Sequence, residues 1–232
     1  MQNSRRTFTR SLILVVGLIA CSLFGLLVNA VYNVHEAGCE SSCVGKFSQL
    51  SLAWRNFYDL NWRFLSIECN EYGDKTLSWL KVVEAVTGFD REKLTCPSNN
   101  GVAYFVVTGP GAVVQDCYSL TEKDVEDGIE NTVVFLEAAT GTGNRQKTLQ
   151  LRIADIGELL DKNQSLPADD VHPLGRGMLF ADGTMCRQVK PLSKQQVQAL
   201  MTAAGHEDVK RTDLVAEGFL TIKFPHTLDF EH

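Results

Sequence analysis

The sequence lacks the motifs by which many hydrolases, metalloproteases and nucleotide-binding proteins are recognised. It has no G-x-S-x-G, no H-E-x-x-H and no G-x-x-x-x-G-K-[ST], and Gly141–Asn144 (GTGN) is not followed by the lysine of a phosphate loop. It also has no C-x-x-C pair of the thioredoxin type. The sequence therefore predicts a protein that is not an enzyme and that holds no cofactor or metal.

Basic residues are scarce beyond the N-terminus. The first 31 residues contain Arg5, Arg6 and Arg10 and no acid, so they contribute +3 to the formal net charge of −6. The other residues contribute −9, from 19 basic and 28 acidic side chains. Nucleic acid requires a basic protein surface, and this composition does not provide one. No nucleic-acid partner is therefore expected.

One long hydrophobic run is present, from Ser11 to Val28, and its 18 residues carry no charge. A helix of that length rises about 27 Å, close to the thickness of the hydrocarbon core. Three arginines precede the run, whereas the next basic residue after it is Lys46. The positive-inside rule then predicts residues 1–10 in the cytoplasm, a single transmembrane helix over 11–31 in the lipid bilayer, and the rest extracytoplasmic, in the periplasm or at the cell surface.

A cleaved secretory signal is the alternative for this segment, because Val28-Asn29-Ala30 resembles a cleavage site. Two features favour a retained helix. The run exceeds the usual apolar core of a signal peptide, about 7–15 residues, and the sequence beyond Ala30 continues to read as a helix. The domain is exported in either case.

The cysteines leave two possibilities open. Cys21 lies inside the hydrophobic run, and six more lie beyond it: Cys39, Cys43, Cys69, Cys96, Cys117 and Cys186. In an exported domain six cysteines allow disulfides in 15 complete connectivities, and buried thiols are the alternative. A zinc site is not indicated, because the C-x-x-x-C pair has no second pair or histidine pair to complete it.

The remaining pattern is that of an α+β domain. No proline occurs from Val34 to Leu65, where aromatic and leucine residues recur at helical spacing, as a core-facing side would. A second helix is expected over Thr76–Val86, a short one over Ile156–Asp161, and a late one from the capping box at Ser193 to Ala204. Strands are expected over Val102–Thr108, Thr132–Glu137, Thr148–Ile153, Gly177–Ala181, Thr184–Val189 and Phe219–Phe224.

Two polar motifs could have either a structural role or a role in catalysis or metal binding. Asp182-Gly183 between two strands predicts a hairpin with a type I′ turn, and His172 precedes it. These two side chains are too few for a catalytic triad or a zinc site, so we interpret Asp182 as a turn residue and His172 as a partner of a loop backbone group. The acidic run Glu122–Glu130 lacks EF-hand spacing and predicts a turn with a short helix.

His172 and Asp182-Gly183 are separated by nine residues in HPLGRGMLFADG. Further motifs precede them in order: the helix from Cys43 to Asp59 (CVGKFSQLSLAWRNFYD), Ser78-Trp79, Cys96-Pro97-Ser98, Val107–Gly111, Asp127-Gly128 and Asn131-Thr132. Over about residues 5–209 the chain thus resembles the prepilin-like proteins named for an H-x9-DG motif, a domain of unknown function expanded in planctomycete-type bacteria.

This resemblance implies a type IV pilin-like architecture, in which a long N-terminal helix lies half in the membrane and half against a mainly antiparallel sheet. It implies a domain over 32–209 with a C-terminal extension over 210–232, and a disulfide between Cys43 and Cys96. The chain departs from prepilins where they carry G-F-T-L-I-E, because Thr7 replaces the glycine at the cleavage site and Leu12 the acidic residue. A permanent anchor is therefore expected in place of a filament subunit.

The sequence thus predicts a membrane-anchored, non-enzymatic, pilin- or pseudopilin-like envelope protein with protein partners. The alternative is an exported binding module for a small ligand, a metal or an envelope polymer at the His172–Asp182 hairpin.

Overall fold

The structure is a computed structural model. It describes the backbone of residues 2–69, 75–77, 79, 81, 84, 102–139, 150–161, 164–167, 175–205 and 208–224. The chain folds as two compact units, Met1–Ser41 and Ser42–His232. The helix α1 (Gln2–Asn61) supplies the whole described part of the first unit and the beginning of the second.

In the first unit, α1 has an apolar surface. The described large apolar side chains between Val16 and Val34 are mostly exposed; Leu18 is 70% exposed and Phe24 is 67% exposed. An 18-residue window of the helix has a mean hydropathy of 1.7, and none of that window is buried. Among the described residues, α1 is the one helix long and apolar enough to cross a membrane, by length and composition.

The second unit combines helices with a six-stranded sheet. Its strands are β1 (Glu68–Cys69), β2 (Lys75–Leu77), β3 (Val102–Thr108), β4 (Val133–Ala139), β5 (Gln150–Arg152), β6 (Ser165–Leu166), β7 (Arg176–Phe180), β8 (Met185–Gln188), β9 (Leu192–Ser193) and β10 (Leu220–Phe224). Its helical segments are the end of α1, the 3₁₀ turns η2 (Glu122–Asp124) and η3 (Ile153–Leu159), α4 (Lys194–Met201) and α5 (Arg211–Ala216).

The six-stranded sheet has the order β10-β8-β7-β4-β3-β5. Its neighbours are antiparallel except β3 and β5, which run parallel. Two further pairs, β1-β2 and β6-β9, are antiparallel. The fold is therefore α+β with a mainly antiparallel sheet, which confirms the predicted class.

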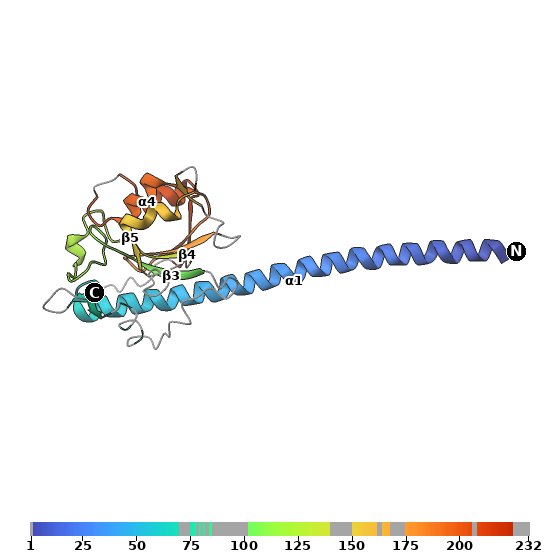
Figure 1. Cartoon of the computed structure of the whole chain (residues 1–232), viewed down its shortest axis with the longest axis horizontal. Helices are drawn as coiled ribbons and strands as arrows, with labels where there is room; N and C mark the ends of the chain where they lie inside the picture. Colours follow the sequence, from blue (N-terminus) through green and yellow to red (C-terminus); the bar gives the residue numbers. More distant parts are fainter. Residues whose placement is uncertain are drawn as a thin grey trace. The chain divides into compact units, whose positions relative to one another are not determined.

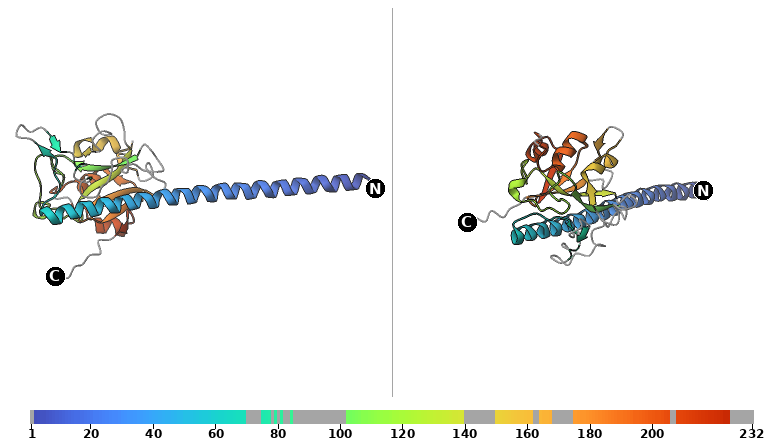
Figure 2. Two further views of the ribbon diagram at one scale, coloured as in Figure 1. Left: turned by 90° about the horizontal axis from the view of Figure 1, so that it is seen from below. Right: turned by 60° about the vertical axis from the view of Figure 1, so that its left-hand side comes forward.

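Helices cover both faces of the sheet. On one face, Phe47 of α1 meets Tyr104 of β3 edge-on at 4.6 Å, and Trp54 meets Phe135 of β4 at 6.0 Å. A Cβ on Gly177 would collide with the Phe47 ring, so α1 lies directly against β7. The helix α4 lies beyond the sheet from α1, as Figure 1 and the right-hand view of Figure 2 show, and buries Val197 and Leu200.

Most of the predicted elements are confirmed with small changes of boundary. The strand β3 has the predicted bounds, and α4 begins with the predicted capping box, in which Ser193 accepts from the Gln196 backbone. The helix expected from Thr76 is wrong at its start, because Lys75–Leu77 forms β2; residues 79, 81 and 84 are helical. The tail beyond residue 210 also belongs to this fold, since β10 pairs with β8.

The disulfide between Cys43 and Cys96, which the resemblance implies, is wrong. Cys43 lies one helical turn before Phe47 on the buried face of α1, where it is 0% exposed and retains a thiol. Cys96 lies outside the described residues. Cys117 is disulfide-bonded, and the side chain of its bonded partner lies outside the part that the structure describes.

Candidate functional site

The hairpin between β7 and β8 is the part of the family-like motif that the structure describes. Gly183 N donates to Phe180 O at 2.9 Å, and Phe180 N donates to Thr184 O at 2.9 Å, so the loop has three residues. Gly183 has a φ of +85°, whereas Asp182 is not among the residues with positive φ. The predicted type I′ turn is therefore wrong: the loop is a turn closed by a glycine bulge, which needs positive φ at the glycine alone.

Asp182 uses both carboxylate oxygens in structural contacts. Its Oδ1 accepts from Thr184 N at 2.8 Å and from Arg211 Nη1 at 3.0 Å. Its Oδ2 accepts from Thr184 Oγ1 at 2.9 Å and lies 2.8 Å from Arg211 Nη2. The side chains of Asp182 and Arg211 are 12% and 14% exposed, so this is a nearly buried bidentate ion pair. The guanidinium also lies 4.9 Å from the centre of the Phe180 ring.

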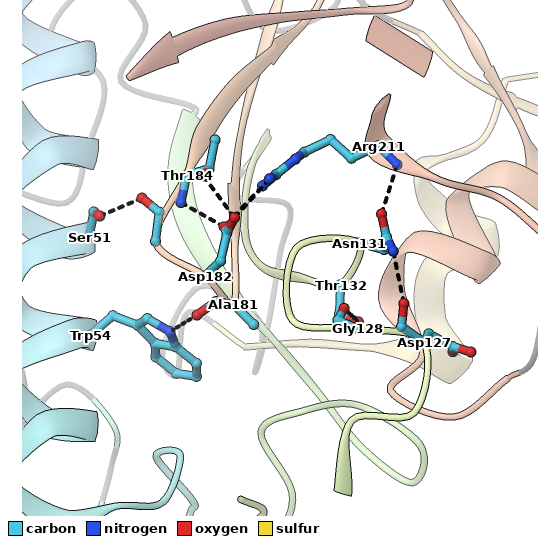
Figure 3. Close-up of polar contacts among 11 residues, drawn as sticks. Ser51, Trp54, Asp127, Gly128, Asn131, Thr132, Ala181, Asp182, Thr184 and Arg211 are labelled. Atoms are coloured by element: carbon cyan, nitrogen blue, oxygen red, sulfur yellow. Dashed lines mark hydrogen bonds and ion pairs between the residues drawn. The ribbon is translucent and has the colours of Figure 1, made fainter. Parts of the chain in front are cut away.

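The other side of the hairpin is joined to α1, as Figure 3 shows. Trp54 Nε1 donates to Ala181 O at 2.7 Å, and Ser51 Oγ donates to Gly183 O at 2.6 Å. Because Ser51 and Trp54 are three residues apart, they lie on one face of the helix. The loop is thus fixed between α1 and α5.

A second polar network, also drawn in Figure 3, fixes the loop before β4. Asn131 Oδ1 accepts from Arg211 N at 3.0 Å, and its amide donates to Asp127 O at 2.9 Å. Asp127 Oδ2 accepts from Gly205 N at 2.7 Å. The predicted turn and short helix of this acidic segment are confirmed by η2, and Asp127 has a structural role there.

A pocket of about 200 Å³ opens beside the hairpin, lined by aromatic side chains of α1 and by carboxyl groups. In its wall the Phe64 ring stacks with the rings of Trp54 and Tyr58, at centroid distances of 5.4 Å and 4.8 Å. Arg55, Asp59 and Glu122 also line it. The pocket therefore combines flat aromatic faces with charged groups of both signs.

A second, more open cleft of about 610 Å³ shares Tyr58 and Glu122 with this pocket and is further lined by Trp62, Thr121 and Lys123. Tyr58 donates to Glu122 Oε2 at 3.2 Å. Partial burial raises the pKa of the Tyr58 phenol, and the neighbouring Glu122 charge adds to that rise. The phenol therefore stays protonated at neutral pH and donates the hydrogen bond to Glu122.

The thiol of Cys186 is not suited to nucleophilic chemistry. Cys186 is 0% exposed in the middle of β8. Burial raises its pKa to about 12, because the low-dielectric surroundings disfavour the thiolate. The Arg211 charge lowers this pKa and the Asp182 charge raises it.

The structure describes two of the three residues of the family-like motif. Asp182 and Gly183 form the hairpin loop, and His172 lies outside the described residues. Within the described part of the chain, no group of three His, Cys, Asp or Glu side chains is placed to hold a metal ion. Sequence reasoning missed Arg211, which lies 29 positions beyond Asp182; its one signal was the predicted strand after it.

No family model, no curated protein and no solved structure matches this chain.

Proposed function

We propose that the chain is a single-pass membrane protein of pilin- or pseudopilin-like type. It is held by its N-terminal helix, exposes its α+β domain outside the cytoplasm, and works through contacts with other envelope proteins. In this proposal the protein performs no catalysis.

The observation that carries the proposal is the change of surface along α1. Between Val16 and Val34 its large apolar side chains are mostly exposed, as lipid contact requires. From Cys43 to Trp54 the same helix buries an aromatic stripe against a sheet. The resemblance to prepilin-like proteins implies such a helix, with one half exposed to lipid and the other half packed in the core of a domain.

The charges give the proposed orientation. Arg5, Arg6 and Arg10 precede the apolar segment, and the first basic residue after it is Lys46. Because positive charge is usually retained in the cytoplasm, this distribution supports an N-terminus inside and a domain outside. The replacements at Thr7 and Leu12 support an anchor that stays in the membrane.

The contacts of Asp182 support a structural role for the hairpin over a ligand site. Both of its oxygens are engaged by Arg211 and Thr184, so a metal or substrate would have to displace an ion pair. Displacing a nearly buried pair costs several kcal/mol, about 3–5 when one partner is removed.

Alkaline extraction combined with protease accessibility tests the proposal. The full chain, with a C-terminal tag, should stay in the membrane pellet after alkaline washing. Protease added outside intact cells or spheroplasts should digest the tagged domain. Release into the alkaline supernatant would contradict the anchor, and protection of the tag would contradict the orientation. Substrate turnover by the purified chain that is lost on His172→Ala, with unchanged stability, would contradict the non-enzymatic role.

A further inference from the structure

The segment before the apolar half of α1 contains two adjacent arginines in a specific order of residues. Ser4 to Arg10 reads SRRTFTR, so a serine directly precedes the pair Arg5-Arg6 and Phe8 follows it after one residue. This order, ahead of an uncharged apolar run, is that of a twin-arginine signal, by which bacteria address proteins to a route that exports folded domains. The positive-inside orientation requires only positive charge, so it leaves this order of residues unexplained.

Adjacent guanidinium groups are a feature that a receptor can distinguish from other positive charge. Each guanidinium presents its donors to a carboxylate as a rigid planar fork, whereas a lysine ammonium is a point charge. An acidic receptor site built for two such forks therefore distinguishes Arg5-Arg6 from two lysines. The first acidic residue of the chain is Glu36, so no carboxylate within the first 35 residues competes for the pair.

The departures from prepilins lie in this same stretch. Thr7 stands at the position of the glycine at the cleavage site, and Leu12 stands at the position of the acidic residue. A twin-arginine signal needs neither of these, because its receptor reads the arginine pair and the apolar residues after it. The segment thus lacks what prepilin processing requires and retains what a twin-arginine receptor requires.

The cysteines of the second unit differ in depth and in oxidation state. Cys186 is 0% exposed and has a free thiol, and Cys43 is 0% exposed and retains its thiol. Cys117, in contrast, is exposed and disulfide-bonded. A chain that crossed the membrane unfolded would present all these thiols together to an oxidising compartment. Folding in the reducing cytoplasm buries the core thiols first and leaves the surface cysteine for later oxidation.

We infer that Arg5-Arg6, with Ser4 and Phe8, is a twin-arginine export address for an acidic receptor at the cytoplasmic face of the membrane, and that the α+β domain folds before it is exported. This inference rests on the proposed anchor and orientation, and it adds the route by which the domain reaches the outside. The address precedes the apolar half of α1, so it stays attached to the retained anchor after export.

The test is export of the full chain, with a C-terminal tag, in a bacterium that has the twin-arginine route. The variant Arg5→Lys/Arg6→Lys keeps the charge of the segment and removes both forks. The matched control, Arg10→Lys, makes the same change outside the pair. Protease added to spheroplasts should digest the tag of the native chain and of the control. The digested fraction should fall at least about tenfold in the pair variant, because lysine cannot replace a bidentate arginine.

A second measurement asks whether the chain that remains inside is folded. N-ethylmaleimide, which crosses membranes, should leave Cys186 of the retained pair variant unmodified in intact cells, since burial in the folded domain excludes the reagent. The same thiol should react after the cells are dissolved in urea. Modification of Cys186 in the intact cells would overturn the inference that the domain folds before export.

Three export results would also overturn the inference: native export of the pair variant, equal losses in Arg10→Lys and the pair variant, or export of the native chain in a host without the twin-arginine translocase. Each would leave the membrane anchor intact. Conversely, release of the native chain from alkali-washed membranes would contradict the proposed anchor without changing the effect of the pair variant on export, so the two failures are distinguishable.

Discussion

Gly183 lies at a point of the hairpin where a side chain is disfavoured on two grounds. Its φ of +85° is in the left-handed region, which residues with a Cβ avoid. A Cβ would also lie 2.8 Å from Arg55 Cδ and 3.2 Å from Ser51 Oγ. The glycine is therefore what allows the hairpin to rest on α1.

Replacement of Gly183 tests this point. We predict that Gly183→Ala lowers the free energy of unfolding by about 1–2 kcal/mol, from backbone strain and the displaced Arg55 side chain. The matched control is Gly157→Ala, because a Cβ there meets nothing within 4 Å and its φ is not positive. Urea unfolding of the full chain in detergent measures both variants, and equal effects would contradict the account.

Cys186 gives a second prediction at the level of one residue. With its pKa raised to about 12, the thiol stays protonated at pH 8, and its burial excludes reagents. Peptide mapping after brief treatment with iodoacetamide should find Cys186 unmodified in the native chain and alkylated in urea. Rapid alkylation of the native chain would show that the interior of the sheet is open to solvent.

Between elements, the Asp182–Arg211 pair joins the β7–β8 hairpin to α5. The same helix is followed by β10, which completes the edge of the sheet beside β8. The chain beyond residue 208 thus contributes to the core through Leu214 and Leu220, both of which are buried. Part of the C-terminal extension predicted over 210–232 therefore belongs to the folded domain.

We predict that Asp182→Asn lowers the free energy of unfolding by about 1–2 kcal/mol, since an amide can still accept from Thr184 but cannot pair with Arg211. Asp182→Ala should cost about 3–5 kcal/mol, because it leaves the guanidinium uncompensated in a nearly buried site. Asp213→Asn, an exposed change on α5, should stay within about 0.5 kcal/mol of the native chain. Equal stability of all three variants would show that the pair does not hold α5 in place.

At the scale of the whole molecule, local signals in the sequence predicted most elements. The β-branched run Val102–Thr108 and the Ser193 capping box predicted β3 and the start of α4, because each signal acts over a few residues. The dipeptide Asp182-Gly183 predicted a hairpin and gave the wrong turn type, since a glycine bulge uses the same residues. Strand pairing accounts for the difference at β2. Residues expected to form the first turn of a helix instead pair with β1, because strand contacts override the local preference of the sequence.

The candidate site was less predictable than the fold, for a physical reason. Arg211 is 29 residues from Asp182, and Glu122 is 64 residues from Tyr58. Spacing within a helix or strand says nothing about such pairs, which form only when the sheet is assembled. The exposed Trp62 could have been noticed only from its place at a helix end, which the sequence did not locate.

The central claim is that the apolar half of α1 remains attached as a membrane anchor. Mass spectrometry of the chain recovered from alkali-washed membranes tests it most directly, by identifying the N-terminal residue of the mature protein. The account predicts that the arginine-containing segment before Ser11 is still joined to the domain. A mature chain that begins at Val31 would contradict it.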